Sequence, residues 1–259
     1  MAISPDFRTY PRASAATTAA VLDAGLRAYM LRVYNWMTSG LALTGIVAYA
    51  IAYFAPLHQL FYRDGVNQFG VVVRNQPTGL AIVSIFAPLA FILVLSLGVN
   101  RLSKSAVQTL FWVFCAAMGA SLTNIFMVYT GESIVRVFFI TAATFAGMSI
   151  YGYTTKADLS RFGSFLFMGL IGIILAGLVN MFMQSSALQF AISVIGVLVF
   201  VGLTAFDTQR IKATYVQFAY ADGADVAGKR SVYDALSLYL NFINLFMLLL
   251  SLFGNRNSN

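Results

Sequence analysis

The longest uncharged stretch of the sequence runs from Phe162 to Phe206, without a single Asp, Glu, Lys or Arg. It is long enough to cross a bilayer twice, because about 20 apolar residues span the hydrocarbon core as a helix. Similar apolar runs recur along the whole chain. A large soluble core is a poor explanation, since only 10% of the residues are charged and soluble domains carry about 25%. We therefore interpret the chain as an integral membrane protein.

The apolar runs divide into seven segments, each long enough for a membrane-spanning helix. Helices are expected because backbone polar groups in lipid must be satisfied within the segment. The fold class is therefore all-α, with a transmembrane domain over residues 25–254 and a short external tail at 255–259. The predicted spans are Asn35–Pro56, Gly79–Val99, Ala106–Tyr129, Ile134–Tyr153, Phe162–Met183, Ala187–Phe206 and Tyr233–Phe253.

The N-terminal region is polar and is expected to lie outside the membrane. Residues 1–24 are rich in Ala, Ser, Thr and Pro, which predicts a disordered tail. The segment from Asp23 to Tyr34 has apolar residues on one side and arginines elsewhere. This pattern favours a short helix at the membrane surface, separate from the first span.

The basic residues are distributed unequally between the two sides of the predicted bundle. Twelve of the 16 lysines and arginines fall on the side of the N-terminus, and four fall on the other. Cytoplasmic loops carry this excess, so the N-terminus is predicted to be cytoplasmic and the C-terminus external. The net charge of +7 is then explained by orientation and by anionic lipid. We expect membrane lipid, and no nucleic acid, as a partner.

The single cysteine and the single histidine restrict the chemistry. Cys115 lies inside an apolar run, and His58 lies outside the spans. Disulfide scaffolds and zinc sites built from Cys and His are therefore excluded. We expect no resident cofactor.

Two aspartates stand at the ends of predicted spans that follow one another. Asp207 directly follows the long uncharged tract, and Asp234 lies just inside the last span at the same depth. Ser237, Asn241 and Asn244 continue from Asp234 at spacings that place all four on one helical face. A polar stripe on a membrane helix faces the bundle interior, which predicts that the C-terminal helix is central.

Simpler explanations of these two residues stay open. A charge near the membrane centre costs roughly 2.5–3.5 kcal/mol, but the cost falls at helix ends, so Asp207 could be a solvated boundary residue. Asp234 could instead complement the dipole at the start of its helix. The pairing with a polar stripe, and an arginine on the same side, Arg101, favour a site.

Two carboxylates that meet cannot both ionise cheaply, so such a pair shares a proton and responds to pH. An arginine such as Arg101 can hold the remaining charge. A fully ionised pair would also attract calcium, which prefers 6–8 oxygen ligands. Asp207 and Asp234 supply at most four, and Asn241, Asn244 and water could add others. We therefore expect a weak calcium site, suited to passage rather than storage.

Several motifs make the sequence resemble the Bax inhibitor-1 family, in the branch of bacterial YccA-like proteins. They are GLALTGIVAY in the first span, FDTQRIK after the sixth, ALSLYLNFINLFMLLLSLFG in the seventh, and TTKADLSRFGSFLFMGLIGIILAGLVN around the fifth. The resemblance covers roughly residues 25–254. It implies seven helices with the last one central, and a pH-sensitive calcium leak in a membrane. The implied di-aspartyl sensor falls on Asp207 and Asp234, and the implied latch arginine on Arg101.

One departure from the family concerns the second span. Some members carry a carboxylate there that faces the pore, whereas this chain reads GLAIVSIFAPLAFILVLSLGV. Strong cation selectivity is therefore not expected from this span.

The sequence is also compared with the requirements of other functions that membrane proteins perform. YccA-like relatives are associated with the membrane AAA+ protease FtsH, so a regulatory partner of such a protease, without ion conduction, is the alternative. An intramembrane aspartyl protease requires a Gly-x-Gly-Asp context, but the chain reads SVYDAL around Asp234. We expect no enzyme activity. A proton-coupled transporter would call for broken helices or an inverted repeat, and neither is evident. The resemblance favours the bacterial cytoplasmic, or inner, membrane.

Overall fold

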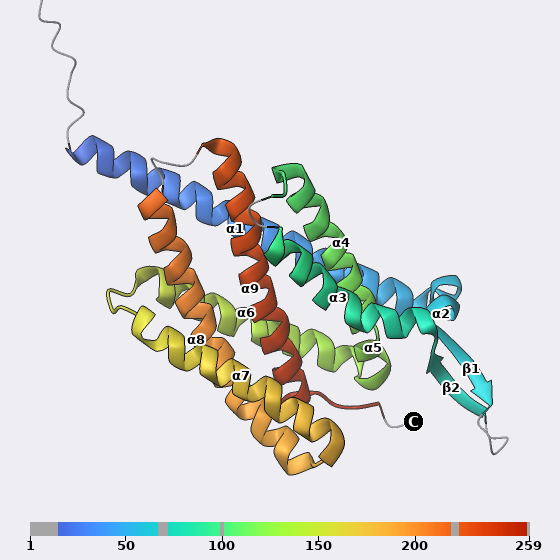
Figure 1. The fold of residues 1–259 in the computed structure, drawn as a ribbon. Coiled ribbons are helices and arrows are strands. Elements are labelled where there is room, and N and C mark those ends of the chain that lie inside the picture. The colour runs from blue at the N-terminus through green and yellow to red at the C-terminus, as the bar shows by residue number, and fades with distance from the viewer. Residues whose placement is uncertain (1–14, 67–71, 99–100, 219–222, 258–259) are drawn as a thin grey trace, which may run out of the picture.

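The computed structural model describes residues 15–66, 72–98, 101–218 and 223–257 (Figure 1). Nearly all of this part of the chain is helical, with one small β-hairpin. The elements are α1 (Ala15–Tyr53), α2 (Ala55–Phe61), β1 (Tyr62–Val66), β2 (Val72–Pro77), α3 (Gly79–Leu97), α4 (Lys104–Leu122), α5 (Asn124–Val128), α6 (Gly131–Thr154), α7 (Ser160–Met183), α8 (Ser186–Phe218) and α9 (Ala224–Phe253).

Seven of the described helices are long and apolar enough to cross a membrane: α1, α3, α6, α7, α8, α9, and the segment formed by α4 with α5. Each predicted span coincides with most of one of them, which confirms the all-α membrane fold. The predicted end of the sixth span and the predicted start of the seventh are wrong, however. α8 has 33 residues and continues to Phe218, and α9 begins at Ala224. Asp207 and Asp234 therefore lie inside helices, rather than at their ends.

The first helix is longer than the sequence indicated. α1 has 39 residues and begins at Ala15. The predicted tail boundary at residue 24 is therefore wrong for residues 15–24, and residues 1–14 lie outside the described part. The expected surface helix is also wrong, because Asp23 to Tyr34 is continuous with the first span. Its apolar side explains this, since Leu26 and Val33 are buried against the core rather than in lipid.

The C-terminal helix runs through the middle of the bundle, as predicted (Figure 1). α9 packs against α1, α4, α6 and α8. Its side chains form much of the core: Ala235, Leu238, Tyr239, Leu245 and Leu250 are fully buried. A helix surrounded in this way can carry polar groups that would be costly against lipid.

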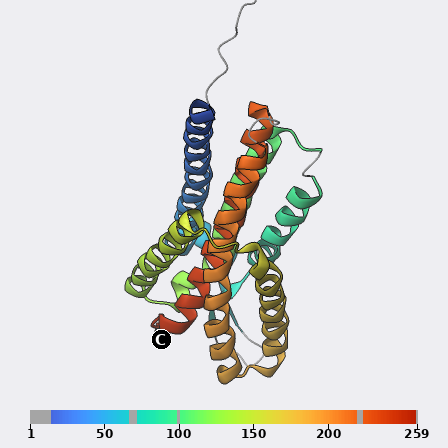
Figure 2. The ribbon, with the colours of Figure 1, turned by 90° about the vertical axis from the view of Figure 1, so that its left-hand side faces the viewer.

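Two helices lie at the edge of the bundle. α3 packs mainly on α4, and α7 packs mainly on α8. Figure 2 shows α3 and α7 on one side of the central helices, with α1 on the opposite side. Their apolar surfaces are largely exposed, as expected of helices that face lipid.

The connection between the first two membrane helices holds a feature that the sequence did not indicate. α2 leads into β1, which pairs with β2 as an antiparallel hairpin with an irregular register between Arg63 and Gly65. Asn75 has a positive φ of 57°, and its backbone N–H donates to Asp64 Oδ1 at 3.0 Å. The hairpin lies at the end of the bundle opposite to the start of α1 (Figure 1).

Candidate functional site

The position of Asp207 is fixed by close packing between α6 and α8. A Cβ at Gly152 would collide with the backbone carbonyl of Ala205, so glycine is needed where the two helices meet. Thr208 Oγ1 donates to Ser149 Oγ of α6 at 3.5 Å. Asp207 is only 6% exposed as a result, and its charge requires partners within the protein.

Asp207 has a charged partner and a neutral one. Arg210 Nη2 lies 2.9 Å from Asp207 Oδ1, one helical turn further along α8. Asn241 Nδ2, on α9, donates to Asp207 Oδ2 at 2.7 Å. Arg210 Nη2 also donates to Ser237 Oγ of α9 at 3.3 Å. The carboxylate and the guanidinium of α8 therefore both contact the polar face of α9.

Asp234 is held from a different side. Tyr29 Oη of α1 donates to Asp234 Oδ2 at 2.6 Å, a contact between residues 205 positions apart. Arg210 and Arg230 also act electrostatically on Asp234. Among the described residues, the hydrogen bonds to the two carboxylates come from these partners, and none joins the carboxylates directly. We call the following residues the carboxylate cluster: Tyr29, Asp207, Arg210, Asp234, Ser237 and Asn241.

The structure brings together most of the residues that the sequence singled out. Asp207, Asp234, Ser237 and Asn241 all take part in the carboxylate cluster. Asn244 does not: it is exposed, and its Nδ2 donates to the carbonyl of Leu240 in its own helix at 2.8 Å.

The arginine beside Asp207 is not the one that the sequence indicated. Arg101 is exposed, and its backbone N–H donates to the carbonyl of Gly98 at the end of α3. The guanidinium at Asp207 belongs to Arg210. The predicted sixth span ends at Phe206, so Arg210 falls outside it. A longer helix would have placed Arg210 three residues from Asp207 on the same face.

The capacity of the cluster for a cation is limited. In the part of the chain that the structure describes, no three His, Cys, Asp or Glu side chains lie close enough together to hold a metal ion. Asp207 and Asp234 supply carboxylate oxygens, but Arg210 already acts on both. A cation would have to compete with this arginine, which favours weak occupancy.

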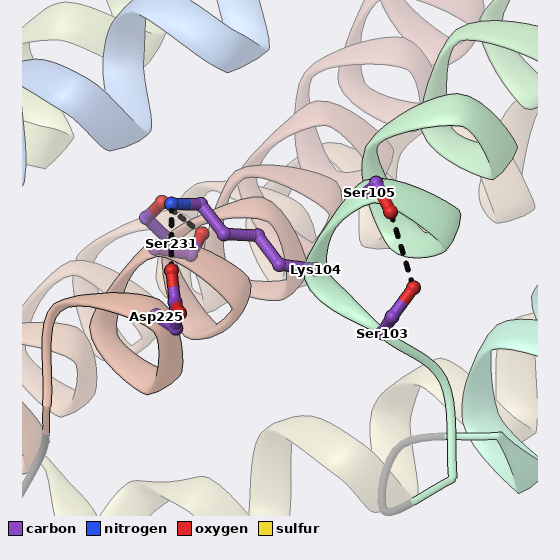
Figure 3. Close-up of polar contacts among 6 residues, drawn as sticks. Ser103, Lys104, Ser105, Asp225 and Ser231 are labelled. Carbon is purple, nitrogen blue, oxygen red and sulfur yellow. Dashed lines mark hydrogen bonds and ion pairs between the residues drawn. The ribbon is translucent and has the colours of Figure 1, made fainter.

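A second aspartate of α9 lies outside the cluster. Asp225, in the first turn, pairs with Lys104 Nζ at 3.2 Å, and its side chain is 89% exposed. Figure 3 shows this contact between the starts of α4 and α9. An exposed pair of this kind contributes little to stability, so Asp225 is a suitable control for Asp234.

Helices α8 and α9, which the carboxylate cluster joins, are also joined by a second polar group toward their opposite ends. Ser193 Oγ of α8 donates to Ser251 Oγ of α9 at 3.2 Å. Gln189 Nε2 donates to Ser251 Oγ at 3.5 Å, and Asn180 Nδ2 of α7 donates to Gln189 Oε1 at 3.1 Å. We call Asn180, Gln189, Ser193 and Ser251 the amide cluster. It carries no charge, and three of its members, Asn180, Gln189 and Ser251, line a surface pocket.

The loop between α6 and α7 is tied to α8 near Asp207. Gln209 Nε2 donates to the carbonyl of Ala157 at 2.8 Å, and Gln209 Oε1 accepts from the N–H of Leu159 at 2.8 Å. Asp158 in this loop accepts hydrogen bonds from the side chain and backbone of Ser160. These bonds lower the pKa of Asp158, which lies outside the membrane helices and is fully exposed.

A groove of about 1080 Å³ separates α1 from α6. Its walls are mainly apolar and include Leu41 and Ile46 of α1 and Ala142 of α6. Phe242 of the central helix also lines it, and Arg27 contributes a charge. α1 is therefore packed against α9 on one side and borders open space on another.

Comparisons with known proteins extend over most of the chain. The family model described as inhibitor of apoptosis-promoting Bax1 matches residues 26–258. The inner membrane protein YbhL of Escherichia coli (strain K12) is 46% identical over 233 residues, which are 90% of this chain and 94% of YbhL. An uncharacterized protein of Rickettsia prowazekii is 45% identical over 235 residues, 90% of this chain and 92% of that protein. An uncharacterized membrane protein of Streptococcus pyogenes is 35% identical over 238 residues, with 91% and 96% coverage.

Proposed function

This chain belongs to the Bax inhibitor-1 family, and on that premise we propose that it is a pH-sensitive, calcium-permeable leak. One observation carries the proposal. A buried carboxylate, Asp207, is held by Arg210 and by Asn241 of the central helix, and a second carboxylate, Asp234, lies about two turns from Asn241 along that helix. Buried charges of this kind are rare in membrane helices and mark ion or proton sites.

The response to pH follows from the contacts of Asp207. While Asp207 is ionised, it holds Arg210 and accepts from Asn241, and these bonds join α8 to α9. Protonation removes the ion pair and one charge-assisted hydrogen bond. The side chain of Arg210 is 43% exposed, so the released guanidinium has access to water. The junction of α8 with α9 weakens, and this is the opening step.

Two arginines are candidates for the latch. Arg210 is favoured by its 2.9 Å contact with Asp207. Arg101, the arginine implied by the family resemblance, precedes α4 on an exposed segment and would have to move to reach the carboxylates. Replacing each in turn, Arg210→Gln and Arg101→Gln, separates these possibilities: the latch is the one whose loss produces flux at neutral pH.

Calcium is proposed as the permeant ion because of the family resemblance, and the two carboxylates form a weak, transient site for it. Asn241, Ser237 and water are the further oxygen sources at this level. We place the protein in the bacterial inner membrane, because its relative YbhL is an inner membrane protein. The excess of basic residues on one side supports a cytoplasmic N-terminus and an external C-terminus.

The test is calcium flux into proteoliposomes between pH 5 and pH 8. Wild type is compared with Asp207→Asn and Asp234→Asn, with Asp225→Asn as the matched control. We expect flux that rises at acid pH in wild type and in Asp225→Asn. Either cluster variant should lose most of this pH dependence. Flux with an unchanged pH profile in both cluster variants would refute the sensor assignment.

The alternative function is regulation of a membrane AAA+ protease without ion conduction. It becomes the better explanation if folded protein gives no flux above empty liposomes. Co-purification of an FtsH-type protease that is lost when residues 1–24 are deleted would support it.

A further inference from the structure

We propose that Tyr29 positions Asp234 and couples its protonation to movement of the N-terminal half of α1. The proposal rests on the function proposed above and names the element that moves. Its starting point is the 2.6 Å hydrogen bond from Tyr29 Oη to Asp234 Oδ2. Tyr29 is 4% exposed, so it is largely shielded from water, whereas Asp234 is partly buried.

The strength of this bond depends on the charge of Asp234. A hydroxyl that donates to a carboxylate forms a short, charge-assisted bond, roughly twice as strong as a neutral one. Protonation of Asp234 converts it into a neutral bond and weakens the attachment of α1 to α9. The other charged groups that act on Asp234 are Asp207 and Arg210 of α8, and Arg230 of α9 itself. Tyr29 is the partner that α1 supplies.

The same part of α1 is held by a second aromatic contact. The ring of Tyr29 lies 4.9 Å from the ring of Tyr215 on α8, measured between centroids. A Cβ at Gly25 would collide with the hydroxyl of Tyr215, so α1 and α8 approach closely one turn earlier. The N-terminal half of α1 therefore depends on the carboxylate cluster and its surroundings for its position.

On its other flank, α1 has space to move. The groove of about 1080 Å³ between α1 and α6 begins at Asp23 and Arg27, beside the segment that Tyr29 anchors. One side of α1 is thus hydrogen-bonded to the carboxylate cluster, while another side borders the groove. Weakening of the Tyr29 bond therefore favours movement of this half of α1 toward α6, on the side that the groove leaves open.

The test pairs two tyrosine variants. Tyr29→Phe removes the hydroxyl and keeps the ring, and Tyr215→Phe is the matched control in the neighbouring ring. Spin labels at the exposed positions Ala28 of α1 and Val226 of α9 report the distance between the helices. Calcium flux is measured on the same samples without labels.

In wild type and in Tyr215→Phe, we expect the distance between the labels to change between pH 8 and pH 5. Tyr29→Phe should reach the acid distance at a higher pH than wild type does. Its flux midpoint should lie about 1 pH unit higher, the equivalent of one hydrogen bond to a charged group. Asp234→Asn keeps an acceptor for the Tyr29 hydroxyl but cannot change its charge, so the distance between the labels should be the same at every pH. This variant provides the test if Tyr29→Phe does not fold.

The outcomes separate the two proposals. A label distance that depends on pH and on Tyr29, in protein without flux, would support this coupling and reject the leak. Flux gated by pH, with Tyr29→Phe indistinguishable from wild type in both measurements, would overturn the coupling and retain the leak.

Discussion

Two polar clusters join α8 to the central helix α9, and they differ in charge and burial. The carboxylate cluster contains two acids and an arginine, and Asp207 is buried within it. The amide cluster, toward the other ends of the same helices, contains only amides and hydroxyls and borders a surface pocket. The first binds partners from α1, α8 and α9, whereas the second links neighbouring helix ends.

This difference indicates where function lies. Neutral groups at a membrane boundary can satisfy one another and cost little. Buried acids cost several kcal/mol unless they are paired, so they are retained where a change of charge is useful. We therefore expect substitutions in the carboxylate cluster to alter both stability and pH response, and substitutions in the amide cluster to alter neither strongly.

The largest effect on stability is expected from Asp207→Ala. The change leaves Asn241 Nδ2 buried without its acceptor, at a cost of about 1–3 kcal/mol. The lost ion pair adds little, because Arg210 is partly exposed. Thermal unfolding in detergent measures the loss. Asp225→Ala, which breaks the exposed ion pair with Lys104, should change the unfolding free energy by about 0–1 kcal/mol. An equal loss of stability in both variants would contradict the difference between the buried cluster and an exposed ion pair.

A smaller effect is expected when each cluster loses an asparagine. Asn241→Leu removes a hydrogen-bond donor that stabilises the ionised form of Asp207. Protonation should then occur at a higher pH, so the pH midpoint of calcium flux should rise. Asn180→Leu, in the amide cluster, should leave the midpoint in place. The two variants are compared by calcium flux between pH 5 and pH 8. A midpoint that moves with Asn180 would place titrating groups outside the carboxylate cluster.

Ser251→Ala should have a still smaller effect. The hydroxyl accepts from Ser193 at 3.2 Å and from Gln189 at 3.5 Å. Gln189 is exposed and can bond to water instead, and Ser193, although buried, keeps an acceptor in the carbonyl of Gln189 at 2.9 Å. We expect a change in unfolding free energy of about 0.5 kcal/mol or less. A loss above about 1 kcal/mol would mean that the amide cluster is as dependent on its partners as the carboxylate cluster.

The smallest effect is expected from Asp158→Asn, in the loop that Gln209 holds. The hydrogen bonds from Ser160 lower the pKa of Asp158 below its ordinary value of 3.8. Its contribution to stability is therefore complete above that value, and is lost as the pH falls through the lowered pKa. Between pH 5 and pH 8 its charge is constant, so Asp158→Asn should keep the wild-type flux midpoint. A shifted midpoint would show that the loop takes part in sensing.

Much of the fold could be predicted because membrane spans are marked by composition alone. All seven spans are marked by long apolar runs, and the central place of α9 follows from Asp234, Ser237 and Asn241 on one face. The helix ends were less predictable. α8 continues past Phe206 because its next two basic residues have partners within the protein. Arg210 pairs with Asp207, and Lys212 Nζ donates to the carbonyl of Tyr153 at 2.9 Å.

The partners in the site were harder to predict than the acids. Arg210 had a local signal, its spacing from Asp207, that only an extended helix makes visible. Tyr29 had none, because a contact across 205 positions depends on how α1 packs against α9. The spacing of Asn244 from Asn241 predicts that both lie on one face of α9. Asn244 lies one turn further along the helix, however, and there it is exposed.

The central claim is that Asp207 and Asp234 respond to pH as one unit, and a double-mutant cycle tests it most directly. Calcium flux across pH 5 to 8 is measured for Asp207→Asn, Asp234→Asn and the double variant, with the pair Asp207→Asn and Asp225→Asn as the uncoupled control. Residues in one network give non-additive effects. We predict that the double variant loses no more pH dependence than the stronger single variant. Additive effects of Asp207 and Asp234, equal to those of the control pair, would contradict the account.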